Sequence, residues 1–131
     1  MNTVTIDSCV IISSLLLTEK RHEEACQIWG KVLSGETPAV MPYSVLVEVV
    51  ASVRRRTGSE LLAIEIQKTL ESIASLSFVM LDGRAAAKAC MIATKTGLRG
   101  MDAIVVQIAK EYKTRLITFD NEMSLKAASV L

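Results

Sequence analysis

Four acidic residues stand apart from the polar company in which most of the 14 aspartates and glutamates of this 131-residue chain lie. They are Asp7, Glu48, Asp102 and Asp120. Carboxylates gathered without a counter-charge raise one another's pKa, so such a group makes chemical sense around a cation. Oxygen ligands without histidine or thiolate select a hard divalent ion, Mg²⁺ or Mn²⁺. The chemistry that follows is metal-assisted hydrolysis of phosphodiester bonds.

Two of the four acids, Asp7 and Asp120, come directly after short β-branched or apolar segments. The segments 3–6 and 115–119 predict buried parallel strands, and α/β enzymes carry their chemistry at the carboxyl ends of such strands. If the last strand returns to pair beside the first, both carboxylates face the crevice at the switch point of the sheet. Capping of the helix that follows is the alternative role for Asp7, because aspartate is a good N-cap residue.

Glu48 lies in the apolar helical segment 44–52. Burying a glutamate there is unfavourable unless its carboxylate has a binding partner. The small residues Ser44 and Ser52 share its helical stripe and leave room beside the carboxylate, and Arg55 follows at i+7. We therefore expect Glu48 to face the crevice. The alternative is that it lies on the exposed face of an amphipathic helix.

Asp102 follows the segment 97–101 and lies in the first turn of its helix, where the helix dipole favours an anion. A helix-start aspartate is common, so this position alone indicates little. Its stripe continues as Val105, Val106 and Ala109, which places Asp102 on the face that the helix buries. We expect it to point toward the same crevice as the other three acids.

The elements that must position these residues alternate along the chain. Hydrophobic periodicity and turn residues predict strands over 3–6, 38–42, 77–81 and 115–119, with helices over 8–17, 21–33, 43–56, 60–74, 85–94, 101–112 and 122–128. Residues 130–131 are at most a stub of a fifth strand. This alternation predicts an open parallel sheet covered by helices on both sides, in a single domain over residues 1–131.

The composition excludes several classes of protein. A net charge of +1 argues against a large basic field for nucleic acid, so any RNA contact must be local. Three cysteines with no CxxC spacing favour reduced thiols in a cytoplasmic protein. No apolar run is long enough to span a bilayer. Apolar residues make up 50% of the chain, which leaves enough apolar surface for self-association.

The ordered set of acidic motifs resembles the PIN domain, and most closely the VapC-type toxin ribonucleases of prokaryotic toxin–antitoxin pairs. The motifs are Ile6-Asp7-Ser8, Glu48, Gly100-Met101-Asp102-Ala103 and Thr118-Phe119-Asp120. The resemblance covers essentially the whole chain. It implies a three-layer α/β/α sandwich around a central parallel sheet of four or five strands. It also implies Mg²⁺ or Mn²⁺ as cofactor, with the four acids as the catalytic and metal-binding set and Thr118 as the accompanying hydroxyl.

The same resemblance implies a function and partners. The chain is expected to be a metal-dependent endoribonuclease that hydrolyses RNA, to form a homodimer, and to pair with an antitoxin whose peptide blocks the acidic groove. Two alternatives remain: a non-toxin nuclease that processes RNA, and a catalytically silent PIN domain that binds RNA or a protein.

Four further residues could assist at such a site. Ser8 could orient a metal ligand, and Glu122 could be an outer ligand, although a solvated acid at a helix start explains Glu122 equally. Arg55 and Arg99 could meet RNA phosphates. For Arg55 the alternative is that it complements the dipole at its helix C-terminus. Because the chain has few aromatic residues, we expect recognition of RNA backbone and shape more than of stacked bases.

Overall fold

The computed structural model describes residues 2–131, and Met1 lies outside the described part. Strands and helices alternate as the sequence predicts. The strands are β1 (Val4–Ile6), β2 (Ala39–Pro42), β3 (Leu76–Val79) and β4 (Arg115–Ile117). The helices are α1 (Ser8–Leu15), α2 (His22–Leu33), α3 (Tyr43–Thr57), α4 (Glu60–Ser72), α5 (Gly83–Thr96), α6 (Gly100–Tyr112) and α7 (Asn121–Ala128).

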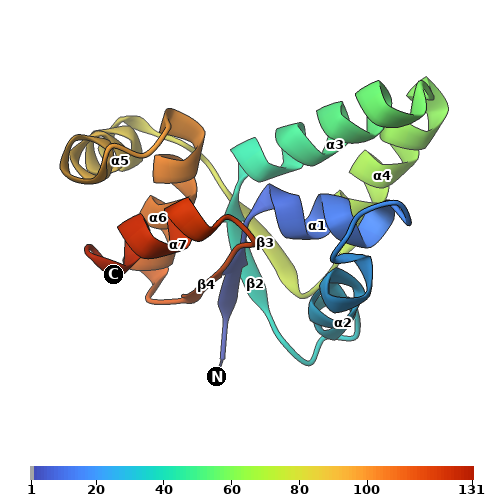
Figure 1. Cartoon of the computed structure of the whole chain (residues 1–131), viewed down its shortest axis with the longest axis horizontal. Helices are drawn as coiled ribbons and strands as arrows, with labels where there is room; N and C mark the ends of the chain where they lie inside the picture. Colours follow the sequence, from blue (N-terminus) through green and yellow to red (C-terminus); the bar gives the residue numbers. More distant parts are fainter. Residues whose placement is uncertain (1) are drawn as a thin grey trace.

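The four strands form one parallel sheet in the order β3-β2-β1-β4. The last strand therefore returns to lie beside the first, with Val4 opposite Arg115 and Ile6 opposite Ile117. This is the arrangement on which the expected convergence of Asp7 and Asp120 depends. Figure 1 shows the sheet nearly edge-on, with α1 to α4 on one side and α5 to α7 on the other. The predicted three-layer α/β/α fold is confirmed.

Of the four or five strands that the sequence allowed, the sheet has four, and the possible stub of a fifth strand at residues 130–131 does not form. The backbone N–H groups of Val130 and Leu131 both donate to the carbonyl of Ala127, so the chain closes in a turn after α7. These residues consequently have no N–H left to pair with an edge strand. Within residues 2–131 the sheet has four strands.

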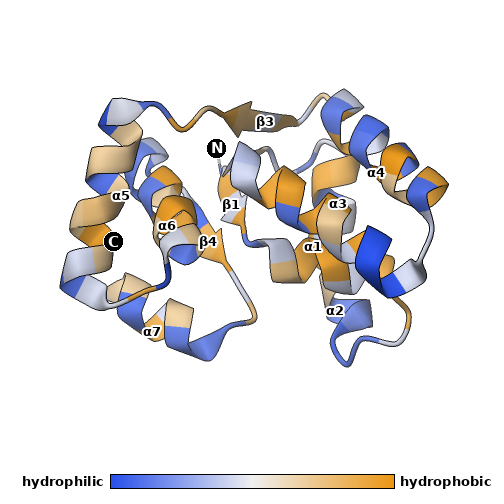
Figure 2. Ribbon diagram, turned by 90° about the horizontal axis from the view of Figure 1, so that it is seen from above, coloured by the Kyte–Doolittle hydropathy of each residue, from blue (hydrophilic) through white to orange (hydrophobic). Residues whose placement is uncertain are grey.

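The core lies on both faces of the sheet, because the central strands expose neither face to solvent. All three residues of β1 and all four of β2 are buried. In Figure 2 the apolar segments of the strands and of α6 lie toward the centre of the molecule. Helix α6 buries Val105, Val106 and Ile108 against the sheet. A rigid central layer of this kind can hold the residues at the strand ends in fixed positions.

The helix ends are made by residues suited to capping. Gly58 and Gly97 adopt left-handed conformations (φ 72° for each) at the ends of α3 and α5. The Ser59 hydroxyl accepts a hydrogen bond from the N–H of Leu62 and starts α4. In residues 2–131 no helix combines the length and the hydropathy needed to cross a membrane.

Candidate active site

Asp7 stands at the carboxyl end of β1, and its surroundings fix it in place. The residue is only 6% exposed, and its backbone N–H donates to the Ile117 carbonyl at 2.9 Å, which extends the pairing of β1 with β4 by one residue. Its Oδ1 accepts from the N–H of Ser8 at 2.9 Å. The carboxylate therefore caps α1, as the alternative interpretation held, and still leaves Oδ2 for other contacts.

Thr118 links the two acids at the strand ends. Its hydroxyl donates to Oδ2 of Asp7 at 2.9 Å and accepts from the backbone N–H of Asp120 at 3.1 Å. Asp120 in turn caps α7 by accepting from the N–H of Met123 at 3.1 Å. A single hydroxyl thus joins the Asp7 carboxylate to the Asp120 backbone, although Thr118 and Asp7 are 111 residues apart in the chain.

Glu48 and Asp102 come from the two helical layers. Glu48 lies in the second turn of α3, on one side of the sheet, and Asp102 in the first turn of α6, on the other side. Both side chains are half-buried. Four elements that are distant in sequence therefore present one carboxylate each.

All four carboxylates line one open cavity of about 590 Å³ at the carboxyl edge of the sheet. Ser8, Cys9, Arg99 and Met101 complete the wall near them. The convergence that the sequence predicted is therefore present, and the amphipathic-face alternative for Glu48 is wrong. The sequence model of the PIN domain matches residues 4–128, which span all four acids. The chain belongs to the PIN domain family.

Solved structures of similar fold include a VapC toxin and a chain from a toxin–antitoxin complex. The crystal structure of VapC20 from Mycobacterium tuberculosis, described as a sarcin–ricin loop cleaving toxin, superposes with a TM-score of 0.78 at 15% identity, over 94% of this chain and 93% of that one. FitAcB from Neisseria gonorrhoeae gives 0.71 at 16% identity, over 96% and 93%. A toxin–antitoxin complex from Klebsiella pneumoniae gives 0.62 at 16% identity, over 90% and 86%. Among curated protein sequences none matches. At these identities the likeness concerns the fold.

In the cavity of this PIN domain, the surroundings raise the pKa values of the two acids that lie on helices, Glu48 and Asp102. Burial raises the pKa of Glu48 above its ordinary value, repulsion from Asp7 and Asp102 raises it further, and the neighbouring Ser8 hydroxyl opposes the rise. Burial also raises the pKa of Asp102, with added repulsion from Asp7 and Asp120 that Arg99 partly offsets. Mutual repulsion of this kind is what a bound cation would relieve.

The donor chemistry of the cavity fits a hard divalent cation. Its wall offers carboxylate and hydroxyl oxygens, and the pKa of the Cys9 thiol is raised to about 11 by burial and by Asp7, so sulfur stays protonated at neutral pH. Among residues 2–131, no three His, Cys, Asp or Glu side chains are grouped closely enough to hold a metal ion by themselves. Mg²⁺ does not require such a group, because it usually keeps several waters and takes one or two carboxylates together with substrate phosphate oxygens.

The auxiliary residues predicted from sequence divide into two groups. Ser8 and Arg99 line the cavity. Arg55 is exposed and does not line it, because its place at i+7 keeps it on the stripe of Glu48 but about 10 Å farther along the helix axis. Glu122 is exposed and forms an ion pair with Lys126 at 2.6 Å, although it is near enough to contribute to the raised pKa of Asp102.

Sequence reasoning missed the part that Cys9 plays. Its thiol donates to Oδ2 of Asp7 at 3.3 Å, lies 3.7 Å from the Thr118 hydroxyl and accepts from the N–H of Phe119 at 3.5 Å. The thiol therefore joins β1 to the β4–α7 connection beside the carboxylates. The available signal was position alone, two residues after a strand-end acid and at the start of a helix.

Proposed function

We propose that this PIN domain is a metal-dependent endoribonuclease that hydrolyses RNA phosphodiester bonds, as the toxin of a VapBC-type toxin–antitoxin pair. The observation that carries the proposal is the convergence of Asp7, Glu48, Asp102 and Asp120 on one cavity at the carboxyl edge of the sheet. Support for an RNA target comes from VapC20, whose fold is similar and which is described as cleaving the sarcin–ricin loop.

Each residue of the cavity has a role under this proposal. Asp7, Glu48, Asp102 and Asp120 would hold Mg²⁺ or Mn²⁺, which supplies an activated water and offsets charge on the phosphoryl group. Thr118 holds Asp7 in its orientation and so acts as a positioning residue. Arg99 stands in the wall beside Asp102 and suits a phosphate oxygen of the substrate.

The two helical acids are suited to proton transfer. Because the pKa values of Glu48 and Asp102 lie above those of ordinary carboxyls, these groups take up a proton more readily than an isolated carboxylate does. If one of the two holds the ion through a bound water and not directly, its carboxylate would accept the proton of that water when it attacks. Their unequal surroundings, with Ser8 facing Glu48 and Arg99 beside Asp102, would distinguish the two roles.

The proposal includes two protein partners. A homodimer is supported by apolar side chains left in water near one corner of the sheet: Tyr43 and Val47 on one face of α3, and Met80 and Leu81 after β3, are between 45% and 72% exposed. Tyr43 stacks on Phe78 with ring centroids 5.4 Å apart, which joins the two groups. An antitoxin partner is supported by the similar fold of the Klebsiella pneumoniae chain, which was solved in a toxin–antitoxin complex.

The experiment that tests the enzyme is cleavage of RNA by the purified chain with Mg²⁺, with Mn²⁺ and with EDTA. We expect cleavage in both metals, none in EDTA, and a loss of more than about 100-fold for Asp102→Asn, since even groups that only support a metal ligand cost 10- to 100-fold when removed. Asp82→Asn is the matched control, because Asp82 caps α5 by accepting from Ala85 N–H and lies outside the acidic cavity.

A second measurement separates the enzyme from a silent PIN domain. An ion that binds only the folded state must stabilise it, by about 1.4 kcal/mol at ten times its dissociation constant. We therefore expect Mn²⁺ to raise the melting temperature of the wild type and to have little effect on Asp102→Asn. Absence of both the thermal shift and cleavage would favour a domain that only binds RNA or protein.

A further inference from the structure

A second cavity adjoins the acidic one and differs from it in charge. It has a volume of about 320 Å³ and lies between α1, the α1–α2 connection, the C-terminal half of α3 and Phe119. The two cavities share Cys9 in their walls, and Phe119 of the second directly precedes Asp120 of the first. A strand seated on the carboxylates and extended past Cys9 in this direction would reach the second cavity.

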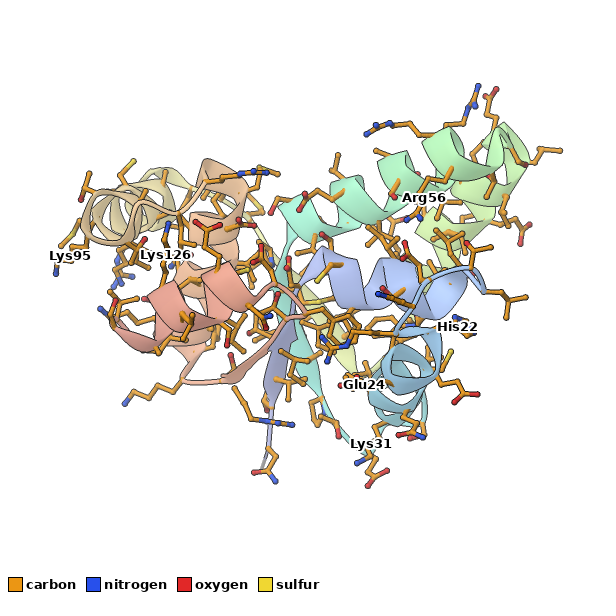
Figure 3. All side chains as sticks on the ribbon, in the orientation of Figure 1. His22, Glu24, Lys31, Arg56, Lys95 and Lys126 are labelled. Carbon is orange, nitrogen blue, oxygen red and sulfur yellow. The ribbon has the colours of Figure 1, made fainter. Side chains whose placement is uncertain are left out.

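The charged side chains of the second cavity are mostly cationic. Lys20, Arg21 and Arg56 face one acid, Glu19. Glu19 is already paired with Arg56 at 2.5 Å, and Figure 3 shows Arg56 on α3, above the connection between α1 and α2. Arg21 is paired with Glu24, which lies outside this cavity, so Lys20 is the one of the three cations that forms no ion pair within residues 2–131. A positive cavity next to four carboxylates suits a substrate that carries phosphates at regular intervals.

Two contacts orient the Arg21 side chain in the wall of this cavity. Its guanidinium carbon lies 3.8 Å from the centroid of the Phe119 ring. Its Nε and Nη2 donate to the two carboxylate oxygens of Glu24 at 3.0 and 2.9 Å. Figure 3 places Glu24 on the side of α2 that faces the sheet.

This arrangement uses one edge of the guanidinium and leaves another. Glu24 takes the edge formed by Nε and Nη2, and within residues 2–131 no acceptor contacts Nη1. The remaining edge, with donors on Nη1 and Nη2, has the fork geometry that binds a phosphate through two parallel hydrogen bonds. The ring of Phe119 and the carboxylate of Glu24 fix the guanidinium in advance, so little rotamer entropy remains to be lost on binding.

We propose that the cavity around Arg21 and Phe119 is a binding site for the RNA phosphate that neighbours the scissile phosphate, with Arg21 as its specific ligand and Lys20 as a supporting cation. The proposal rests on the proposed nuclease function and names where the strand runs beyond the carboxylates. The guanidinium already covers one face of Phe119, so the site binds backbone and not a base stacked on that face. It would therefore bind a nucleic acid strand without regard to its base sequence.

The test compares Arg21→Gln with Arg84→Gln on two substrates. Arg84 is the matched control, because it is 77% exposed on α5 and lines a different cavity. On a short single-stranded RNA in Mn²⁺ we expect Arg21→Gln to raise KM about tenfold with little change in kcat, since a charge-assisted hydrogen bond is lost. On bis(p-nitrophenyl) phosphate, a diester with no neighbouring phosphate, Arg21→Gln should behave as the wild type.

A role that is only structural predicts other results. If Arg21 merely joins α2 to the β4–α7 connection, Arg21→Gln would impair hydrolysis of both substrates or change kcat. The salt dependence gives a second readout: the slope of log Kd against log salt for metal-free RNA binding should fall by about 0.7 in Arg21→Gln, as expected for one lost phosphate contact on a single strand. An unchanged slope together with an unchanged KM for RNA would overturn the proposal.

Failure of the nuclease function would be distinguishable from failure of this site. If the wild type hydrolyses neither substrate but Arg21→Gln still weakens RNA binding and lowers its salt slope relative to Arg84→Gln, the phosphate site stands and the enzyme assignment is wrong. If the wild type hydrolyses both and Arg21→Gln equals Arg84→Gln in every measurement, the enzyme stands and the phosphate site is wrong.

Discussion

The two pairs of carboxylates in the acidic cavity are built differently. The strand-end pair, Asp7 and Asp120, caps the helices that follow, and the Thr118 hydroxyl ties the two together. The helix pair, Glu48 and Asp102, stands on helices from opposite layers and has raised pKa values. No hydrogen bond within residues 2–131 fixes the Asp102 carboxylate. The difference suggests that the strand-end pair is preorganised and that the helix pair is adjustable.

Such a division has a physical rationale. Local hydrogen bonds already stabilise the strand-end carboxylates in the folded protein, so their positions do not depend on an ion. The helix pair has repulsion to relieve and can move closer when a cation offsets the charge. Stability and reactivity should therefore respond differently to substitution in the two pairs, and this can be measured.

The largest expected effect does not distinguish the two pairs. Asp7→Asn and Glu48→Gln should each reduce Mn²⁺-dependent cleavage of RNA by more than about 100-fold, because each removes a carboxylate that would bind the ion. Initial rates at saturating RNA measure the loss, with circular dichroism to establish that both variants fold. Retention of full activity by either variant would show that its side chain is not a ligand.

The next effect concerns the thiol beside the strand-end pair. With its pKa at about 11 against an ordinary 9.0, Cys9 should have about 100-fold less thiolate at neutral pH than an unperturbed cysteine and should be alkylated correspondingly slowly. Cys26 and Cys90 are exposed and serve as internal controls. Mass spectrometry of tryptic peptides after timed exposure to iodoacetamide in EDTA gives the three rates. Equal alkylation rates for the three cysteines would mean that the Cys9 thiol beside Asp7 and Asp120 is accessible to solvent.

A third substitution removes the link within the strand-end pair. Thr118→Val keeps the shape of the side chain but deprives buried Asp7 of a donor and the Asp120 N–H of an acceptor. We expect a loss of about 2 kcal/mol in the free energy of unfolding, because unpaired buried polar groups are costly. Cleavage should fall about tenfold. Thr118→Ser, which retains the hydroxyl, is the control for urea denaturation and for activity. If Val and Ser behave alike, the hydroxyl does not position the pair.

Much of this site could be predicted because its signals are local. A β-branched run that ends on an acid marks a strand end in Asp7 and Asp120, and an acid in an apolar helix marks an unusual carboxylate in Glu48. Contacts that depend on distance along a helix axis, or on which strands pair in the sheet, could not be predicted from such local signals. Arg55 lies on the same helical stripe as Glu48 but too far along the helix axis to reach the cavity. The contact of Arg21 with Phe119 depends on the pairing of β1 with β4, which brings these distant parts of the chain together.

The sequence also could not show which apolar residues remain in water. Met80 and Leu81 have the composition of a continuing strand, yet β3 ends at Val79 and both side chains are exposed. Leu61 has the periodicity of a core residue in α4 but is 78% exposed. Periodicity identifies a face of an element, whereas the neighbour that covers the face is set by the tertiary arrangement or by a partner chain.

The smallest effect is the one specific to the helix pair. Without metal, Asp102→Asn should raise the free energy of unfolding at pH 7 by about 0.5 kcal/mol, a small value because the partly exposed carboxyl is screened by solvent. The sign follows from the raised pKa: above the ordinary values of 3.8 for Asp102 and 4.5 for Glu48, the folded state holds more protons than the unfolded chain, so stability falls as pH rises through that window. Asp102→Asn and Glu48→Gln should flatten this fall.

Urea denaturation in EDTA from pH 4 to pH 7 measures the profile, with Asp82→Asn as a control that leaves the cavity unchanged. Asp7→Asn should show no comparable gain, because the amide has one acceptor oxygen in place of two and cannot accept from both the Ser8 N–H and the Thr118 hydroxyl as the carboxylate does. A gain for Asp7→Asn equal to that for Asp102→Asn would mean that repulsion is shared by all four acids. The distinction between a preorganised pair and an adjustable pair would then be wrong.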